Sequence, residues 1–415
     1  MENHSKQWWQ SAVIYQIYPR SFYDSNGDGI GDLEGIAQRL DYLQTLGADA
    51  VWISPLCLSR TTNFWDPDPA LGTKEDLETL AVRAGERGIR VIVDAEGPPK
   101  GENTSSLLEI GRRQDRPYYY SIWHRNPADG TVGLTFQGEH ELLDQQEGRE
   151  KWDLAPLPLV KFKKVFTKWQ QNLYGKGWNG LLWENYRQPR SVSRFGDDGR
   201  YRMQAAKMLG TLLFGMRGTP FLYQGEELGM ANVKFDIEEY RDPELLAMYR
   251  ERMAEGFDEL DVMRSIYEKG SDNARTPMQW DDSPHAGFTA GTPWIRCNPD
   301  YTMVNAAEEL VNQDSVFHYY QKLIRLRKKE KIFTEGGYEP LWEENENIFA
   351  YVRGTQEEEL LVLCNFRGQE IPCPPMREWE EGEVLTANYD GHRAKGILRP
   401  YEAMIIKKRK EGFHA

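Results

Sequence analysis

A repeated alternation of strand-like and helix-like segments limits the fold of this chain more than any other feature of its sequence. Six short apolar runs occupy residues 13–19, 48–55, 89–95, 132–139, 179–185 and 219–227. Amphipathic runs follow the first five, at residues 35–47, 73–88, 106–114, 158–173 and 201–216. This alternation is typical of parallel βα units, in which each helix returns the chain to the start of the next strand.

The number of these units bears on the architecture. A closed parallel barrel normally has eight strands with helices outside, whereas this sequence shows about six recognisable βα units. Linkers after several strands carry Asp, Glu, Asn and aromatic residues, which favours a barrel with a functional rim at the strand C-termini. Residues 1–332 are therefore predicted to form a truncated TIM-type (β/α) barrel, so the fold class is α/β.

The pattern changes after about residue 332. Runs with a period of two, such as "NIFAYVRG" and "ELLVLCNF", are separated there by Pro, Gly and acidic turns. Alternation of this kind indicates antiparallel strands with one buried face. Residues 333–415 are predicted to form a C-terminal antiparallel β-sandwich domain.

Composition and charge narrow the range of partners. The net charge of −14 would repel nucleic acid and anionic membranes, and no stretch reaches the ~18 apolar residues of a membrane span. The N-terminus lacks the pattern of a secretory signal. The four cysteines lack metal-ligand spacing. We therefore expect free thiols in a cytoplasmic protein. The 13 Trp and 21 Tyr residues give the chain many aromatic rings, which suit a sugar ligand.

The segment "DSNGDGIGD" places oxygen ligands at alternate positions around a glycine-rich turn. This spacing resembles the first part of an EF-hand loop, although Gly35 replaces the bidentate Glu at position twelve. One interpretation is a calcium site; the other is an Asx-rich turn that caps the next helix. The ligands predicted for the cation are Asp24, Asn26, Asp28, the Ile30 carbonyl and Asp32.

Four motifs carry a resemblance to a known family. They are "AVIYQIYPRSFYDSNGDGIGDLEGIAQRLDYLQTLGADAVWISP", "QPRSVSRFGDDGRYR", "GTPFLYQGEELGM" and "DNARTPMQWDDSPHAGFT". Together they resemble the oligo-1,6-glucosidase and α-glucosidase branch of glycoside hydrolase family 13. The resemblance implies a (β/α)8 barrel with a domain inserted after the third strand and a C-terminal β-sandwich. It also implies that "DSNGDGIGD" is the family's calcium loop, which favours structural calcium as the cofactor.

Compared with this family pattern, the chain lacks a long segment between residues 130 and 134. The resemblance implies that the rest of the inserted domain and barrel strands four and five would lie there, with the nucleophile Asp and the acid/base Glu. After the third strand Asp94 is kept, but Pro98 and Pro99 replace Asn and His. After the seventh strand Tyr186 replaces a sugar-contacting His, and Arg187 replaces the transition-state Asp. No catalytic residue of the family pattern is therefore expected to remain.

Part of the family's sugar site persists. The resemblance implies that Trp65 stacks on a pyranose and that Asp66 binds glucose hydroxyls together with Arg275, although a leftover surface ion pair is the alternative. The carboxyls of Glu226 and Glu227 are expected to be structural.

Two main functional hypotheses follow. The first is a catalytically inactive pseudo-glycosidase that binds α-glucosides or a protein partner. In that case either the barrel recloses, or its exposed edge is covered by a second copy of the chain or by another protein. The alternative is an active glycoside hydrolase on α-glucosidic oligosaccharides with relocated carboxylates, since retaining glycosidases need two carboxyls ~5 Å apart. Its candidate residues are Asp94, Glu96, Glu139 and Glu184. A third hypothesis is a decaying gene product with no selected role.

Overall fold

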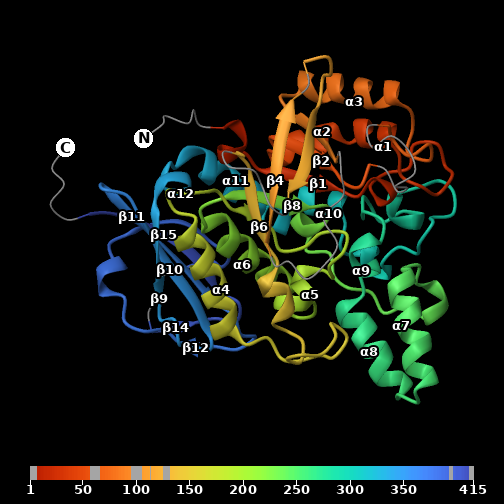
Figure 1. Ribbon diagram of the computed structural model, residues 1–415. Helices are drawn as coiled ribbons and strands as arrows, with labels where there is room; N and C mark the ends of the chain where they lie inside the picture. The colour runs from red at the N-terminus through yellow and green to blue at the C-terminus, as the bar shows by residue number, and fades with distance from the viewer. Residues whose placement is uncertain are drawn as a thin grey trace.

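The computed structural model describes residues 7–56, 66–94, 105–112, 114–124, 131–391 and 396–410 (Figure 1). Within these residues, a barrel-like sheet lies among helices, and a second sheet forms the C-terminal part of the molecule. The predicted architecture of a (β/α) barrel followed by an antiparallel β domain is therefore confirmed. The described part contains no helix with the length and apolar character needed to cross a membrane.

The first sheet has eight strands among the described residues, in the order β6-β4-β5-β3-β2-β1-β8-β7. Their bounds are β1 Ile14–Ile17, β2 Ala50–Ile53, β3 Arg90–Asp94, β4 Ser105–Arg112, β5 Tyr119–His124, β6 Leu134–Gln137, β7 Gly180–Leu181 and β8 Thr219–Tyr223. A parallel bridge between Thr135 and Asn179 joins the two ends of this sheet. Within the described residues the barrel is therefore nearly closed, and the partner expected to cover an exposed barrel edge stays a prediction.

The wall between β3 and β6 differs from the sequence-based prediction. A helix was expected near 106–114, but this segment forms β4, which pairs antiparallel with both β5 and β6. β5 in turn pairs parallel with β3. The helix prediction was wrong because pairing with strands on both sides satisfies the backbone hydrogen bonds of β4, and tertiary pairing overrides weak local preference.

The remaining barrel helices confirm the predicted periodicity. Helix α3, expected at 73–88, begins after Thr73, whose hydroxyl accepts a hydrogen bond from the Asp76 backbone N–H in a capping box. The helix expected at 35–47 is divided in two at Arg39. The helices of the barrel region are α1 Leu33–Gln38, α2 Leu40–Leu46, α3 Lys74–Glu86, α4 Leu159–Asn172, α5 Ser191–Phe195, α6 Arg202–Gly215, α7 Pro243–Ala254, α8 Glu259–Lys269, α9 Asp272–Arg275, α10 Ala306–Val311, α11 Val316–Lys329 and α12 Ile332–Glu335.

The C-terminal region forms a five-stranded antiparallel sheet in the order β13-β15-β11-β10-β9, and a two-stranded sheet of β12 and β14. The buried Arg353 joins this sheet to the barrel region, because it donates hydrogen bonds to the carbonyls of Gly215 and Phe333. The strand bounds are β9 Gly337–Leu341, β10 Ile348–Gly354, β11 Glu358–Asn365, β12 Ile371–Pro372, β13 Glu383–Ala387, β14 Ile397–Leu398 and β15 Ala403–Arg409.

Aromatic side chains fill the barrel interior. Phe136 and Phe221 lie edge to face with ring centroids 4.9 Å apart, and Trp52 lies 5.4 Å from Phe221. Trp123, from the antiparallel segment β5, contacts Phe136 at 5.2 Å. Such contacts add to the hydrophobic gain of burial. Among the described residues, the barrel interior is thus a packed core.

Candidate active site at the barrel mouth

A cavity of about 270 Å³ opens at the mouth of the barrel. Its floor is formed by the aromatic rings of Trp52, Trp123 and Phe136, which continue into the packed interior. The remaining lining is largely polar, with side-chain amides, hydroxyls, one carboxyl and one guanidinium. These residues are Gln16, Ser54, Ser105, Ser106, Gln137, Gly138, Glu141, Leu182, Asn185, Tyr186, Arg187 and Gln188.

Asp94 ends β3 and lies just behind this lining, 6% exposed. Its carboxylate accepts hydrogen bonds from Trp52 Nε1 at 2.8 Å, from Ser121 Oγ at 2.8 Å and from Ser54 Oγ. Burial raises the pKa of Asp94 to about 6, while these donors and the charge of Arg187 oppose the rise. Asp94 is therefore mostly ionised at neutral pH.

Glu141 is a second carboxyl at the mouth, and sequence reasoning missed it. It lies in the short helix Glu139–Leu142 that follows β6, is half-buried, and lines the cavity directly. Burial raises the pKa of Glu141 to about 7, and Asp144 adds to the rise, whereas Arg194 and Arg187 oppose it. Its position just after the fourth predicted strand, residues 132–139, was the signal that could have identified it, because rim residues lie at strand ends.

Two neighbours position the Glu141 carboxyl. Gln188 Nε2 donates a hydrogen bond to Glu141 Oε2 at 2.6 Å. Arg194 in turn donates to Gln188 Oε1 at 2.8 Å and to the Glu141 carbonyl at 2.6 Å. The Arg194 side chain is 3% exposed and pairs with Asp144, so this support is rigid.

Tyr186 and Arg187, predicted at the seventh strand end, both line the cavity. The Tyr186 ring stacks on Tyr18 with centroids 5.5 Å apart, and the exposed Arg187 guanidinium lies 5.3 Å from the Tyr186 ring. The charge of Arg187 acts on both Asp94 and Glu141. The structure therefore brings Tyr186, Arg187 and Asp94 into one region, as expected for strand ends of one barrel rim.

The other carboxyls considered from the sequence lie elsewhere. Glu184 is 1% exposed and forms a buried ion pair with Arg190 at 3.0 Å, which suits a structural role. Glu139 accepts hydrogen bonds from Lys168 at 2.7 Å and from Trp169 at 2.9 Å. Glu96, like Pro98 and Pro99, falls outside the described residues.

Among the described residues, Arg275 does not pair with Asp66 as predicted for sugar binding. Trp65 lies outside the described residues, and Asp66 is exposed. Arg275 Nη1 instead pairs with Asp242 at 3.0 Å and with Asp272 at 3.4 Å, and its Nε donates to the Tyr186 carbonyl at 2.8 Å. Arg275 thereby fixes the loop that carries Tyr186.

The "DSNGDGIGD" loop forms a series of Asx turns. The buried Asp24 carboxylate accepts from the backbone N–H groups of Asn26, Gly27 and Gly29, and from Thr289. Asp32 caps α1 by accepting from the Gly35 N–H at 2.6 Å.

Two of the other three oxygen ligands predicted for calcium, those of Asn26 and Asp28, are also engaged within the loop. Asn26 Oδ1 accepts from the Asp28 N–H, and Asp28 Oδ1 accepts from the Ile30 N–H. Across the described residues, no group of three or more His, Cys, Asp or Glu is arranged to hold a metal. A carboxylate has about four acceptor positions, so these hydrogen bonds fit either interpretation of the loop, and the calcium site stays a prediction.

The carboxyls after β8 are enclosed. Glu227 accepts hydrogen bonds from Tyr15 at 2.7 Å and from Tyr42 at 2.6 Å, and burial raises its pKa to about 7. Glu226 accepts from Tyr320 at 3.1 Å, and burial with the neighbouring charge of Glu184 raises its pKa well above the usual range. Both are buried and lie outside the mouth cavity, which supports the structural role expected from the sequence.

Comparison with known proteins places the chain. The α-amylase catalytic-domain family matches residues 16–126 and 102–336. The oligo-1,6-glucosidase of Bacillus cereus is 36% identical over 555 aligned positions, which cover 97% of this chain and 99% of that protein. The oligo-1,6-glucosidase of Parageobacillus thermoglucosidasius is 37% identical over 558 positions, which cover 97% of this chain and 99% of that protein. The crystal structure of Bacillus licheniformis trehalose-6-phosphate hydrolase has a TM-score of 0.84 at 30% identity, covering 98% of this chain and 100% of that chain.

These comparisons correct one expectation from the sequence. A catalytically inactive protein was predicted, but the similar proteins carry the names of hydrolases and are matched over nearly their whole lengths. The inference of inactivity was wrong because it relied on individual motif positions and gave no weight to similarity along the whole chain. By that similarity, the chain belongs to the α-amylase family, glycoside hydrolase family 13, within its oligo-1,6-glucosidase branch.

Proposed function

We propose that this protein is a glycoside hydrolase that acts on α-glucosidic oligosaccharides, with its catalytic carboxyls at the barrel mouth. The observation that carries the proposal is the cavity lined by Glu141, with Asp94 directly behind the lining. The similarity to oligo-1,6-glucosidases supports this choice of substrate class.

The two carboxyls differ in the way that glycoside hydrolysis requires. One carboxyl must be protonated to give its proton to the leaving-group oxygen, and the other must be ionised to act as nucleophile or general base. With a pKa of about 7, Glu141 is half protonated at neutral pH and suits the role of general acid. With a pKa of about 6, Asp94 suits the ionised role.

The alignment with the Bacillus cereus enzyme agrees with a catalytic carboxyl pair at other positions than in the family pattern. The 555 aligned positions exceed the 415 residues of this chain by 140, so the Bacillus cereus enzyme has segments without a counterpart here. In this chain β4 and β5 occupy the wall between β3 and β6. A working carboxyl pair would therefore come from the ends of β3 and β6.

The remaining lining suits a single sugar ring. Amide groups of Gln137, Asn185 and Gln188 can exchange hydrogen bonds with hydroxyls, since each amide both donates and accepts. The Trp123 ring offers an apolar surface to the C–H groups of a pyranose. A cavity of about 270 Å³ is at the small end of ligand sites, so one glucosyl unit would enter and the rest of the substrate would lie outside.

The test is hydrolysis of isomaltose and p-nitrophenyl α-glucoside by the whole chain. Glu141→Gln and Asp94→Asn should each lower kcat by at least about 100-fold, the usual scale of a lost general acid. Matched controls are Glu86→Gln and Asp282→Asn, which change exposed carboxyls. Hydrolysis that survives both substitutions at the mouth, or no hydrolysis by the parent protein, would refute the proposal.

A further inference from the structure

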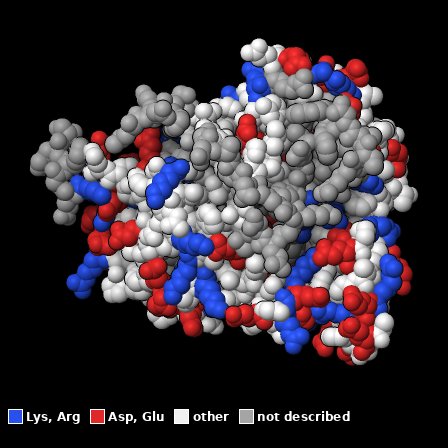
Figure 2. All heavy atoms as spheres, viewed as in Figure 1, with Lys and Arg blue, Asp and Glu red and all other residues white. Residues whose placement is uncertain are grey.

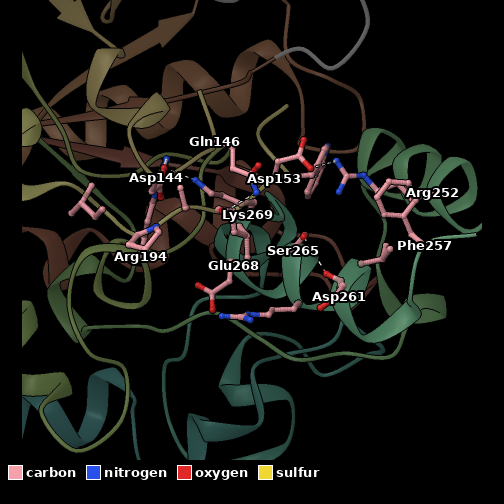
Figure 3. Close-up of a pocket in the computed structure, with 17 residues that line it drawn as sticks. Asp144, Gln146, Asp153, Arg194, Arg252, Phe257, Asp261, Ser265, Glu268 and Lys269 are labelled. Atoms are coloured by element: carbon pink, nitrogen blue, oxygen red, sulfur yellow. Dashed lines mark hydrogen bonds and ion pairs between the residues drawn. The ribbon is translucent and has the colours of Figure 1, made fainter. Parts of the chain in front are cut away.

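A second cavity, larger than the barrel mouth, lies between the loop after β6 and helix α8 (Figure 3). Its volume is about 600 Å³, within the range of small-molecule sites. One wall is the segment 152–157, and the opposite wall is α8 with the turn that joins it to α7. All the residues that line it are described, and none of them lines the mouth cavity.

A cluster of three charges, Asp144, Arg194 and Lys269, forms one end of this cavity (Figure 3). Arg194 donates to both Asp144 oxygens, at 2.7 and 2.8 Å, and Lys269 also pairs with Asp144. Lys269 is 6% exposed, and within the described residues its Nζ has no hydrogen-bond partner besides this ion pair. An ammonium has three protons, so Lys269 can still donate to a ligand in the cavity.

The other end of the cavity combines a second ion pair with aromatic rings. Arg252 pairs with Asp153 at 3.1 Å, and its guanidinium lies 5.2 Å from the Phe257 ring. Phe257 is 46% exposed, whereas Trp152, which also lines the cavity, is buried. An exposed ring beside charged groups offers both an apolar face and hydrogen bonds to one ligand.

The charges of the lining indicate which ligand fits. Four basic side chains and four acidic ones face the cavity, and Figure 2 shows both signs intermixed over the surface of α7 and α8. An anion or a cation would meet like charges and would have to displace an existing partner. Hydroxyl groups add to the paired charges without breaking them, because a carboxylate has about four acceptor positions.

We propose that this cavity is a second binding site for a short uncharged oligosaccharide, separate from the hydrolytic site at the barrel mouth. Lys269 and Asp144 hold hydroxyl groups at one end, and Phe257 contacts a pyranose face at the other. The cavity is large enough for about two sugar rings. Arg194 belongs to both sites, since it also supports Glu141, so it is not used to separate them.

The experiment is calorimetric titration of the whole chain, as Glu141→Gln to prevent turnover, with maltotriose. Phe257→Ala should weaken one class of sites by about three- to tenfold, the scale of one aromatic contact. Tyr174→Ala is the control, because Tyr174 is equally exposed at 48% but lies outside this cavity. Ser265→Phe, which fills the cavity from α8, should remove that class of sites altogether.

The inference fails if Phe257→Ala and Ser265→Phe, with melting temperatures like the parent, bind maltotriose as the parent does. It also fails if inorganic phosphate binds at this cavity in place of maltotriose. Hydrolysis by Phe257→Ala in the otherwise wild-type chain is measured separately. A protein without hydrolytic activity would refute the proposed function but would leave the maltotriose titration fully informative.

Discussion

The charge of Arg187 provides the sharpest test of the proposed chemistry. If Asp94 must be ionised and Glu141 protonated, activity follows a bell-shaped pH profile whose limbs lie near pH 6 and pH 7. At pH 8 only about 9% of Glu141 would carry a proton, and at pH 5 only about 9% of Asp94 would be ionised. The rate should therefore be highest near pH 6.5 and fall on both sides.

Replacement of Arg187 by Met should move both limbs to higher pH. Arg187 lowers the pKa of both carboxyls, so its removal raises both. Coulomb's law in water gives about 0.5 kcal/mol for two unit charges about 8 Å apart, so we expect each limb to shift by a few tenths of a pH unit. Arg187 is exposed, and its substitution should leave the fold intact.

The assay is kcat/KM for p-nitrophenyl α-glucoside between pH 4.5 and 8.5, in buffers of constant ionic strength. The exposed Arg200 gives a control, because Arg200→Met removes the same charge away from the cavity lining. A profile of Arg187→Met that shifts in only one limb, or shifts to lower pH, would refute the assignment of both carboxyls.

Three further predictions concern stability. The pKa of Glu227 is about 7 in the folded protein, above its ordinary value of 4.5, so ionisation of Glu227 destabilises the fold progressively between pH 4.5 and 7. Glu227→Gln should lessen this loss of stability by up to about 3 kcal/mol, measured by urea unfolding at pH 8 relative to pH 4.5. Burial lowers the pKa of His140 to about 3 from 6.5, so stability is lost as pH falls from 6.5 towards 3, and His140→Phe should flatten this acid limb by up to about 4 kcal/mol. Calcium at millimolar concentration should raise Tm and Asp28→Ala should abolish the rise; an unchanged Tm in calorimetry would favour the Asx-turn interpretation of the loop.

The parts of the fold that sequence could predict are those with strong periodicity. The helices now seen as α3, α4 and α6 each agree with the expected ranges to within two residues at either end, because their apolar positions recur with helical spacing. The segment that became β4 has a weaker pattern. Its state depends on strands to either side, which no local sequence window contains.

The candidate site was predictable only in part for a similar reason. Asp94 lies at the end of the predicted strand 89–95, and Tyr186 and Arg187 follow the predicted strand 179–185, so their place on the rim could be inferred. Glu141 lies four residues beyond β6, and its proximity to Gln188 depends on how two loops meet. The pKa of Glu141 is raised because its carboxyl is buried, and no sequence motif encodes that burial.

The antiparallel wall of the barrel has a consequence for redesign. The three strands β4, β5 and β6 come from one stretch of sequence, residues 105–137, in which β4 pairs with both β5 and β6. Elsewhere in the barrel, neighbouring strands are joined through long crossovers. This wall could therefore be exchanged as one block of sequence. A replacement would have to reproduce its two backbone junctions, β3 with β5 and Thr135 with Asn179, together with the Ser121 hydrogen bond to Asp94.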